Sequence, residues 1–293
     1  MPEGDSVYRT AARLREALAG KVLTRSDLRV PRFATADLTG RTTLGVVPRG
    51  KHLLIRLGPA SAPDAQTREA ATPLTLHTHL RMDGTWRVFP TATATAAAGT
   101  ATTPHPPHPT RPAGPAGPAH EIRVILATAD DTAVGYRLPV VELLRTADEH
   151  RAVGHLGPDL LGPDWNAATA AANLLAAPGR PLGEALLDQR NLAGIGNIYK
   201  SELCFLAALT PWTPVGDIPP ATLPRITAAA HRLLDANKAR HRNTTGSHRP
   251  GQELFVYGRA HRPCLRCGTP VREAAQAGRP TYWCPRCQSG PAL

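Results

Sequence analysis

The chain has 293 residues, with 34 Lys and Arg against 23 Asp and Glu, and a formal net charge of +11. This length exceeds the size at which one hydrophobic core keeps growing, and the excess of cations indicates a polyanionic partner, nucleic acid ahead of a membrane surface. Because no apolar stretch is long enough to span a bilayer and no basic, apolar leader opens the chain, we expect no membrane association. We expect a monomer in the cytoplasm, associated with the nucleoid.

The N-terminal segment reads Met1-Pro2-Glu3-Gly4-Asp5. Removal of Met1 before a small residue would leave a secondary amine with a carboxylate directly behind it. On these residues alone, the ordinary explanation is a loose terminus before a helix, with Asp5 as its N-cap and Gly20 at its end. Apolar residues recur in that helix at helical spacing, at Val7, Ala11, Leu14 and Leu18.

β-type runs follow, several of them alternating apolar and polar residues with Gly or Pro between, which predicts an antiparallel β-sandwich. The runs are "KVLTRSDLRV", "TTLGVVPRGKHLLIRL", "PLTLHTHLRM", "GTWRVF", "EIRVILATA" and "DTAVGYRLPVVELL". In the second run, Pro48 to Lys51 are predicted to form a tight turn that holds Lys51 on a rigid scaffold, although a charged turn residue is usually just solvated.

Residues 91–120 interrupt the β region and contain almost no large apolar side chain. Such a segment cannot bury enough surface to offset its ordering entropy, so we predict a disordered insertion between two strands. His105 and His108 fall within it and are expected to be solvated.

From about residue 150 the pattern becomes helical, with segments separated by Pro and Gly: "ATAAANLLAA", "PLGEALLDQR", "NIYKSELCFLAAL" and "ATLPRITAAAHRLLDANKAR". In "LLDQRNLAGIGNIYKSE", Leu186 and Leu187 end one helix, Gly194 and Gly196 permit tight turns, and Asn197 opens the next helix. Amides at that helix start are a candidate phosphate site, and an ordinary helix hairpin is the alternative.

Two CxxC pairs at the C-terminus, Cys264 with Cys267 and Cys284 with Cys287, are typical of a tetrahedral thiolate site. Four thiolates leave no open position, so we predict one structural Zn²⁺. A redox CxxC would need a thioredoxin-like context that neither pair has. The lone Cys204 is expected to be a small buried hydrophobe.

The cysteine region "VYGRAHRPCLRCGTPV" with "GRPTYWCPRCQ" resembles the zinc finger of the formamidopyrimidine-DNA glycosylase and endonuclease VIII family. The string around Asn197 resembles that family's helix-two-turn-helix, and "VVPRGKHLLIRL" matches its lysine hairpin. This resemblance covers almost the whole chain except the insertion. It implies an α+β fold of three parts: an N-terminal antiparallel β-sandwich with flanking helices over 1–145, a helix-two-turn-helix DNA-binding domain over 146–245 and a zinc-finger hairpin over 246–293.

The resemblance also assigns roles. The mature Pro2 amine would be the nucleophile that forms an iminium at the sugar, Glu3 would donate and accept protons, and Lys51 and Arg279 would assist strand cleavage. Asn197 and Lys200 would bind the phosphodiester of damaged DNA. Arg81 and Met82, in "THLRMDGTW", would fill the gap left by an extruded base, with a core position as the alternative for Met82. No diffusible cofactor is implied.

The chain departs from the family at Ser6, where many members carry glutamate, and at "DTAVGYRL", where the formamidopyrimidine branch has an Arg-Phe pair. "PEGD" and "RPTYWCP" look more like endonuclease VIII, which implies oxidised pyrimidines as main substrates. His77 and His79 are expected to be structural, while the position of His155 suggests an approach to DNA. Rival interpretations are a non-catalytic zinc-ribbon DNA-binding protein, a zinc hydrolase and, within the family, an 8-oxoguanine glycosylase.

Overall fold

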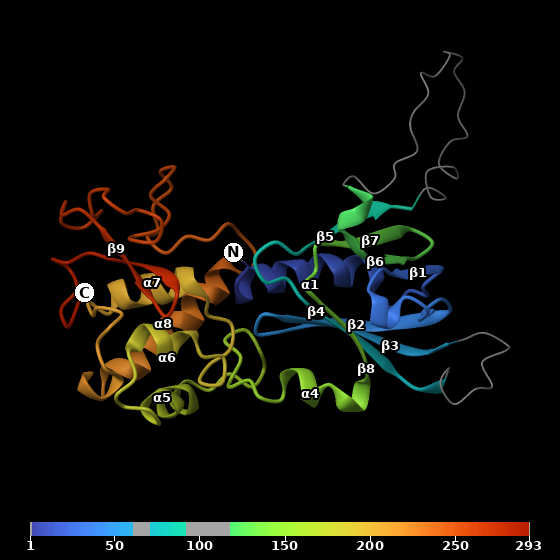
Figure 1. Cartoon of the computed structure of the whole chain (residues 1–293), viewed down its shortest axis with the longest axis horizontal. Helices are drawn as coiled ribbons and strands as arrows, with labels where there is room; N and C mark the ends of the chain where they lie inside the picture. The colour runs from blue at the N-terminus through green and yellow to red at the C-terminus, as the bar shows by residue number, and fades with distance from the viewer. Residues whose placement is uncertain (1, 61–70, 92–117, 293) are drawn as a thin grey trace, which may run out of the picture. The chain divides into compact units, whose positions relative to one another are not determined.

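The computed structural model describes residues 2–60, 71–91 and 118–292, so most of the predicted insertion lies outside the described residues. The chain divides into two compact units, which are described separately (Figure 1). The first unit comprises Arg9–Pro48 and His52–Ala152. The second comprises Pro2–Tyr8, Arg49–Lys51 and Val153–Leu293.

The first unit is a β-sandwich of two four-stranded sheets, with strand orders β1-β6-β7-β5 and β2-β3-β4-β8. Its strands are β1 (Arg25–Leu28), β2 (Arg41–Arg49), β3 (His52–Ala60), β4 (Leu74–His79), β5 (Thr85–Pro90), β6 (Ile122–Ala127), β7 (Asp131–Tyr136) and β8 (Val140–Arg145). Every predicted β run contains at least one of these strands. The second predicted run splits into β2 and β3, and the last into β7 and β8, with Arg137 between β7 and β8 at a positive φ of 47°.

Helix α1 (Gly4–Leu18) follows the N-terminus directly, as predicted. The four apolar positions at helical spacing are all buried, at 0–1% exposure. Gly20, with a φ of +76°, takes the left-handed conformation just beyond the helix. Asp5 lies inside the first turn instead of capping it, so the N-cap prediction is wrong.

Helices dominate the second unit. They are α5 (Ala167–Leu175), α6 (Leu182–Leu187), α7 (Asn197–Leu206) and α8 (Thr222–Asn237); the short α4 (His150–Val153) precedes them. Their apolar faces meet in one core, in which Leu186, Tyr199 and Leu234 are fully buried. Cys204 belongs to this core at 0% exposure, as expected of a small buried hydrophobe.

The second unit ends in a two-stranded hairpin of β9 (Arg272–Gln276) and β10 (Arg279–Trp283), joined by Ala277 and Gly278. Both turn residues have positive φ, which matches the right-handed twist of a two-residue hairpin. Phe205 at the end of α7 packs into a small cluster with Val256, Val271 and two cysteines. Among the described residues, no helix combines the length and apolarity that a bilayer crossing demands.

Candidate active site

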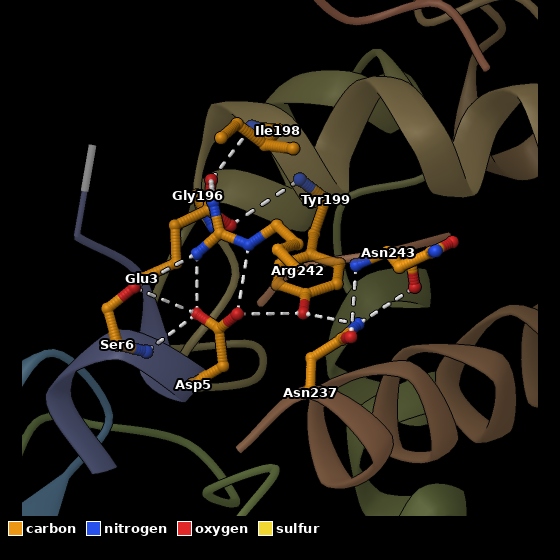
Figure 2. A network of polar contacts seen from close by, with 9 residues as sticks. All are labelled: Glu3, Asp5, Ser6, Gly196, Ile198, Tyr199, Asn237, Arg242 and Asn243. Atoms are coloured by element: carbon orange, nitrogen blue, oxygen red, sulfur yellow. Dashed lines mark hydrogen bonds and ion pairs between the residues drawn. The ribbon is translucent and has the colours of Figure 1, made fainter. Parts of the chain in front are cut away.

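The Glu3 side chain is fully buried against the start of α7. Its carboxylate accepts hydrogen bonds from the amides of Gly196 and Ile198, both at 2.8 Å, and a longer one of 3.4 Å from Tyr199 (Figure 2). The partial positive charge of a helix N-terminus stabilises such an anion. These amides were predicted to form a phosphate site; in the structure they hold Glu3 instead.

Glycines make this approach possible. A Cβ on Gly196 would lie 2.5 Å from both Cγ and Cδ of Glu3, closer than any real contact. Gly194, with a φ of +117°, accepts the Gly4 amide at 2.9 Å through its carbonyl. The two predicted tight-turn glycines therefore bring the N-terminal segment into direct backbone contact with the loop before α7.

Asp5 is the second buried anion of this segment, with 0% exposure. It accepts from Nε and Nη2 of Arg242, at 2.9 and 2.5 Å, and from the Tyr199 hydroxyl at 3.1 Å. Ser6, at the position where many family members have glutamate, donates its amide to Asp5 at 2.7 Å and accepts from Arg242 at 3.3 Å. Figure 2 shows these side chains converging from the N-terminal segment, α7 and the loop after α8.

Lys51 lies in the two-residue turn between β2 and β3, as predicted. Gly50 before it has a φ of +55°, and its amide donates to the buried carboxylate of Asp159 at 2.7 Å. Burial lowers the pKa of Lys51 to about 8; the negative charge of Glu3 opposes this shift, and the positive charge of Arg279 adds to it. This electrostatic coupling places three of the predicted catalytic residues in one neighbourhood of the second unit.

Helix α7 also holds the β9–β10 hairpin. The Asn197 side-chain amide donates to the carbonyl of Pro280 at 2.7 Å, and Lys200 Nζ donates to Thr281 Oγ1 at 2.6 Å. Lys200 is fully buried, and burial lowers its pKa to about 8. Arg279, the first residue of β10, is exposed beside the hairpin turn. The structure thus gives Asn197 and Lys200 a role in holding the hairpin that presents Arg279.

The four C-terminal cysteines form the group predicted from their spacing. Their sulfurs lie within 4.8 Å of one another, with 3.9 Å between Cys264 and Cys287 and 3.5 Å between Cys267 and Cys284. A tetrahedral zinc with bonds of about 2.3 Å to sulfur needs edges of about 3.8 Å, so these residues fit one Zn²⁺. With all four positions taken by thiolates, the site is structural.

Arg81 and Met82 belong to the first unit, in the turn after β4. Met82 is 59% exposed, which rules out the alternative of a core position. Arg81 has a positive φ of 45°, and both side chains line a hollow of about 540 Å³ together with Arg123 and Arg137. An exposed apolar side chain among arginines suits contact with nucleic acid, and the gap-filling role stays a prediction.

The nearby histidines have structural partners. Within the sandwich, His77 hydrogen-bonds to Glu142 and His52, both at 2.8 Å, and His79 accepts the amide of Arg81 at 2.9 Å. This agrees with the structural role expected for His77 and His79. His155 is exposed in the second unit, and its approach to DNA stays a prediction.

Comparison with known protein families identifies the family to which this chain belongs. Residues 1–137 match the formamidopyrimidine-DNA glycosylase N-terminal domain, residues 156–248 the H2TH domain of the same glycosylase, and residues 262–290 the zinc finger found in FPG and IleRS. The chain belongs to the formamidopyrimidine-DNA glycosylase and endonuclease VIII family. The predicted fold class is confirmed, as is the four-cysteine zinc finger.

Curated members of the family match over 95% or more of their length. A probable endonuclease 8 2 of Streptomyces coelicolor is 59% identical, covering 100% of this chain and 95% of that protein. The DNA-(apurinic or apyrimidinic site) lyase Nei2 of Mycolicibacterium smegmatis is 45% identical over 99% of both chains. An endonuclease 8 of Escherichia coli is 31% identical over 98% of this chain and 100% of its own.

Solved structures of the family share the fold. MutM in complex with carbocyclic 8-oxo-G containing DNA superposes with a TM-score of 0.72 at 20% identity, over 99% of this chain and 100% of that one. The Lactococcus lactis Fpg bound to DNA with an abasic site gives 0.71 at 23% identity, over 98% and 100%.

Sequence reasoning did not single out Tyr199, Arg242 or Asp159, although each contacts the segments that carry predicted catalytic residues. Tyr199 and Arg242 lie more than 190 positions from Asp5 along the chain, so no local spacing connects them. The available signal was Asp5 itself, an acid two positions after Glu3. A carboxylate that is buried requires a cationic or hydrogen-bonding partner.

Proposed function

We propose that the chain is a bifunctional DNA glycosylase and abasic-site lyase that removes oxidised bases, mainly pyrimidines, through an iminium on Pro2. The observation that carries the proposal is the anchoring of Glu3 on three helix-start amides, because this fixes the residue next to Pro2 beside Lys51 and Arg279. The names of its relatives, endonuclease 8 and DNA-(apurinic or apyrimidinic site) lyase, support the same activity.

Removal of Met1 creates the nucleophile. An α-amine has a pKa of roughly 8, well below that of a lysine, so more of it is unprotonated near neutrality. The Pro2 nitrogen attacks the sugar C1′, and the bond to the damaged base breaks with its electron pair leaving on the base. The proton of the Pro2 nitrogen passes to the Glu3 carboxylate, and Glu3 delivers it to the ring oxygen as the sugar opens. The nitrogen lone pair then forms a positively charged iminium with C1′.

The iminium is an electron sink for strand cleavage. It acidifies the adjacent C2′, loss of that proton expels the 3′ phosphate by β-elimination, and a second elimination expels the 5′ phosphate. Lys51 and Arg279 are cations that stabilise the leaving phosphates. Because a stacked base hides its sugar from a nucleophile, the damaged nucleotide is extruded first, and Met82 with Arg81 fills the gap.

The zinc finger supplies no chemistry in this proposal. Its thiolates would hold Zn²⁺ in a closed tetrahedral site, and the hairpin built on them presents Arg279. Neither a zinc hydrolase nor a purely binding zinc ribbon uses a buried glutamate next to an N-terminal secondary amine. Neither rival function therefore explains the arrangement of Glu3.

The test is single-turnover base release from duplex oligonucleotides, each carrying one defined lesion, by protein with a verified Pro2 terminus. We expect release of thymine glycol to outpace release of 8-oxoguanine, with cleaved strands that end in phosphate on both sides of the gap. Faster release of 8-oxoguanine would assign the chain to the formamidopyrimidine type. Absence of both base release and strand cleavage would refute the proposed activity.

A further inference from the structure

We propose that Asp5 and Arg242 are positioning residues for the nucleophile, a buried ion pair that fixes where the Pro2 amine lies. The proposal rests on the proposed function, because it needs Pro2 to be the reacting group. Neither Asp5 nor Arg242 is one of the four cysteines or of the four predicted DNA-binding residues, which are Asn197, Lys200, Arg81 and Met82.

The pair has the geometry of a strong interaction. The guanidinium donates Nε to one carboxylate oxygen at 2.9 Å and Nη2 to the other at 2.5 Å, which is the two-point fork that arginine forms with carboxylates. Asp5 is 0% exposed and the Arg242 side chain only 12%. Removing one partner of such a pair leaves an uncompensated buried charge, so the structure depends on both.

A second layer of contacts sets the orientation of Asp5. The Tyr199 hydroxyl donates to Asp5 at 3.1 Å and accepts from Asn237 at 3.2 Å, and the Arg242 guanidinium lies 4.9 Å above the Tyr199 ring. Burial and the charge of Asp5 raise the pKa of Tyr199, so the hydroxyl keeps the proton that it donates. Asn237 exchanges hydrogen bonds with the backbone of Asn243, which ties the network to the loop after α8 (Figure 2).

This network fixes the backbone directly behind the nucleophile. Glu3 is anchored on α7, the Gly4 amide on the Gly194 carbonyl, and Asp5 on Arg242 and Tyr199, so three consecutive residues are each tied to the second unit. Arg242 Nη1 also lies 3.8 Å from the Glu3 carboxylate, so one cation balances both acids. Pro2 is bonded to the first of these three residues, and its position follows from theirs.

The consequence is kinetic. Enzymes gain rate by holding reacting atoms in a near-attack geometry, and a displacement of about 1 Å can cost about a hundredfold in rate. We therefore expect changes to the pair to slow the attack of Pro2 on C1′ far more than they weaken DNA binding.

The experiment compares D5N with the wild type in two measurements. One is the single-turnover rate of borohydride-trapped adduct formation on saturating abasic DNA, and the other is the Kd for DNA carrying an uncleavable tetrahydrofuran abasic analogue. We expect D5N to lower the trapping rate at least about tenfold while Kd changes less than about threefold. R242K keeps the charge but loses the two-point fork, so its rate should fall between those of D5N and the wild type.

The matched control is D188N, which removes a carboxylate of the same unit that pairs with Arg180 and Arg190, both at 2.7 Å. It should trap at the wild-type rate. If D5N is unfolded at the assay temperature, Y199F tests the inference in its place. It removes only the hydroxyl that orients Asp5 and should still slow trapping at unchanged Kd.

Two results overturn the inference while leaving the proposed function intact: wild-type trapping by D5N, or equal losses in rate and affinity, which would indicate a general structural role. Failure of the wild type itself to trap would overturn both, because no nucleophile would then exist to be positioned.

Discussion

The surroundings of Lys51 lower its pKa into the pH range in which binding assays are run. Burial lowers the value to about 8 in the free protein. A phosphate prefers the protonated side chain, so binding is favoured below this pKa and weakens as pH rises through it. We predict that the Kd for tetrahydrofuran DNA increases between pH 7 and 9.5, measured by fluorescence anisotropy at constant ionic strength.

The matched variant K51R separates this lysine from the buried Lys200, whose pKa is also about 8. Arginine keeps its proton throughout this range, so K51R should bind with little dependence on pH. If K51R retains the wild-type pH profile, another group is responsible and the role assigned to Lys51 is wrong.

At the scale of elements, the start of α7 is shaped to receive Glu3. A Cβ at Gly196 would meet the Glu3 side chain at 2.5 Å, and the carboxylate cannot withdraw without leaving three amides unpaired. We predict that G196A lowers the free energy of unfolding by about 1–3 kcal/mol and reduces trapping on abasic DNA strongly.

Thermal unfolding and the trapping assay check both effects. The control is G179A in the same unit, where a Cβ has no atom within 4 Å and φ is not positive. G179A should be neutral or slightly stabilising. A fully active, stable G196A would contradict the close approach of Glu3 to this helix.

The proposed function requires an intact zinc hairpin to present Arg279. This hairpin has almost no hydrophobic core of its own. Its buried cluster contains Val256, Val271 and two of the cysteines themselves. We predict that C264A loses zinc and weakens binding to abasic DNA at least about tenfold, because metal loss unfolds such a module.

Zinc content by atomic emission and anisotropy measure these effects. C204A is the control, since Cys204 is the cysteine outside the cluster and should keep full zinc occupancy. Undiminished DNA binding by zinc-free protein would contradict the assignment of the hairpin to DNA contact.

The elements themselves were largely predictable, and the contacts between distant segments were not. Periodicity located α1 and the strands, and cysteine spacing alone identified the metal site. Asp5 shows the limit: its type and place predicted an N-cap, but its partner Arg242 lies 237 positions away and decides its conformation. Similarly, the string around Gly196 predicted a free anion site, and only the fold reveals that Glu3 occupies it.

For the whole molecule, the net charge of +11 predicts binding to nucleic acid that weakens with salt. Each neutralised phosphate contributes about 0.9 to the slope of log K against log salt concentration, so loss of one contacting arginine reduces the slope by about 1. We predict this change for R279A.

A titration of Kd between about 50 and 200 mM salt supplies the slope. The exposed Arg225 on α8 provides the control, and R225A should keep the wild-type slope. An unchanged slope in R279A would remove Arg279 from the DNA interface.

The central claim is that the chain reacts with DNA through its Pro2 amine. The most direct test mixes protein of verified N-terminus with abasic DNA and borohydride, and then locates the adduct by peptide mass spectrometry. We predict a covalent protein–DNA complex linked at Pro2, lost in P2G or when Met1 is retained. A wild-type protein that yields no adduct, or one linked at Lys51 or another lysine, would contradict the account.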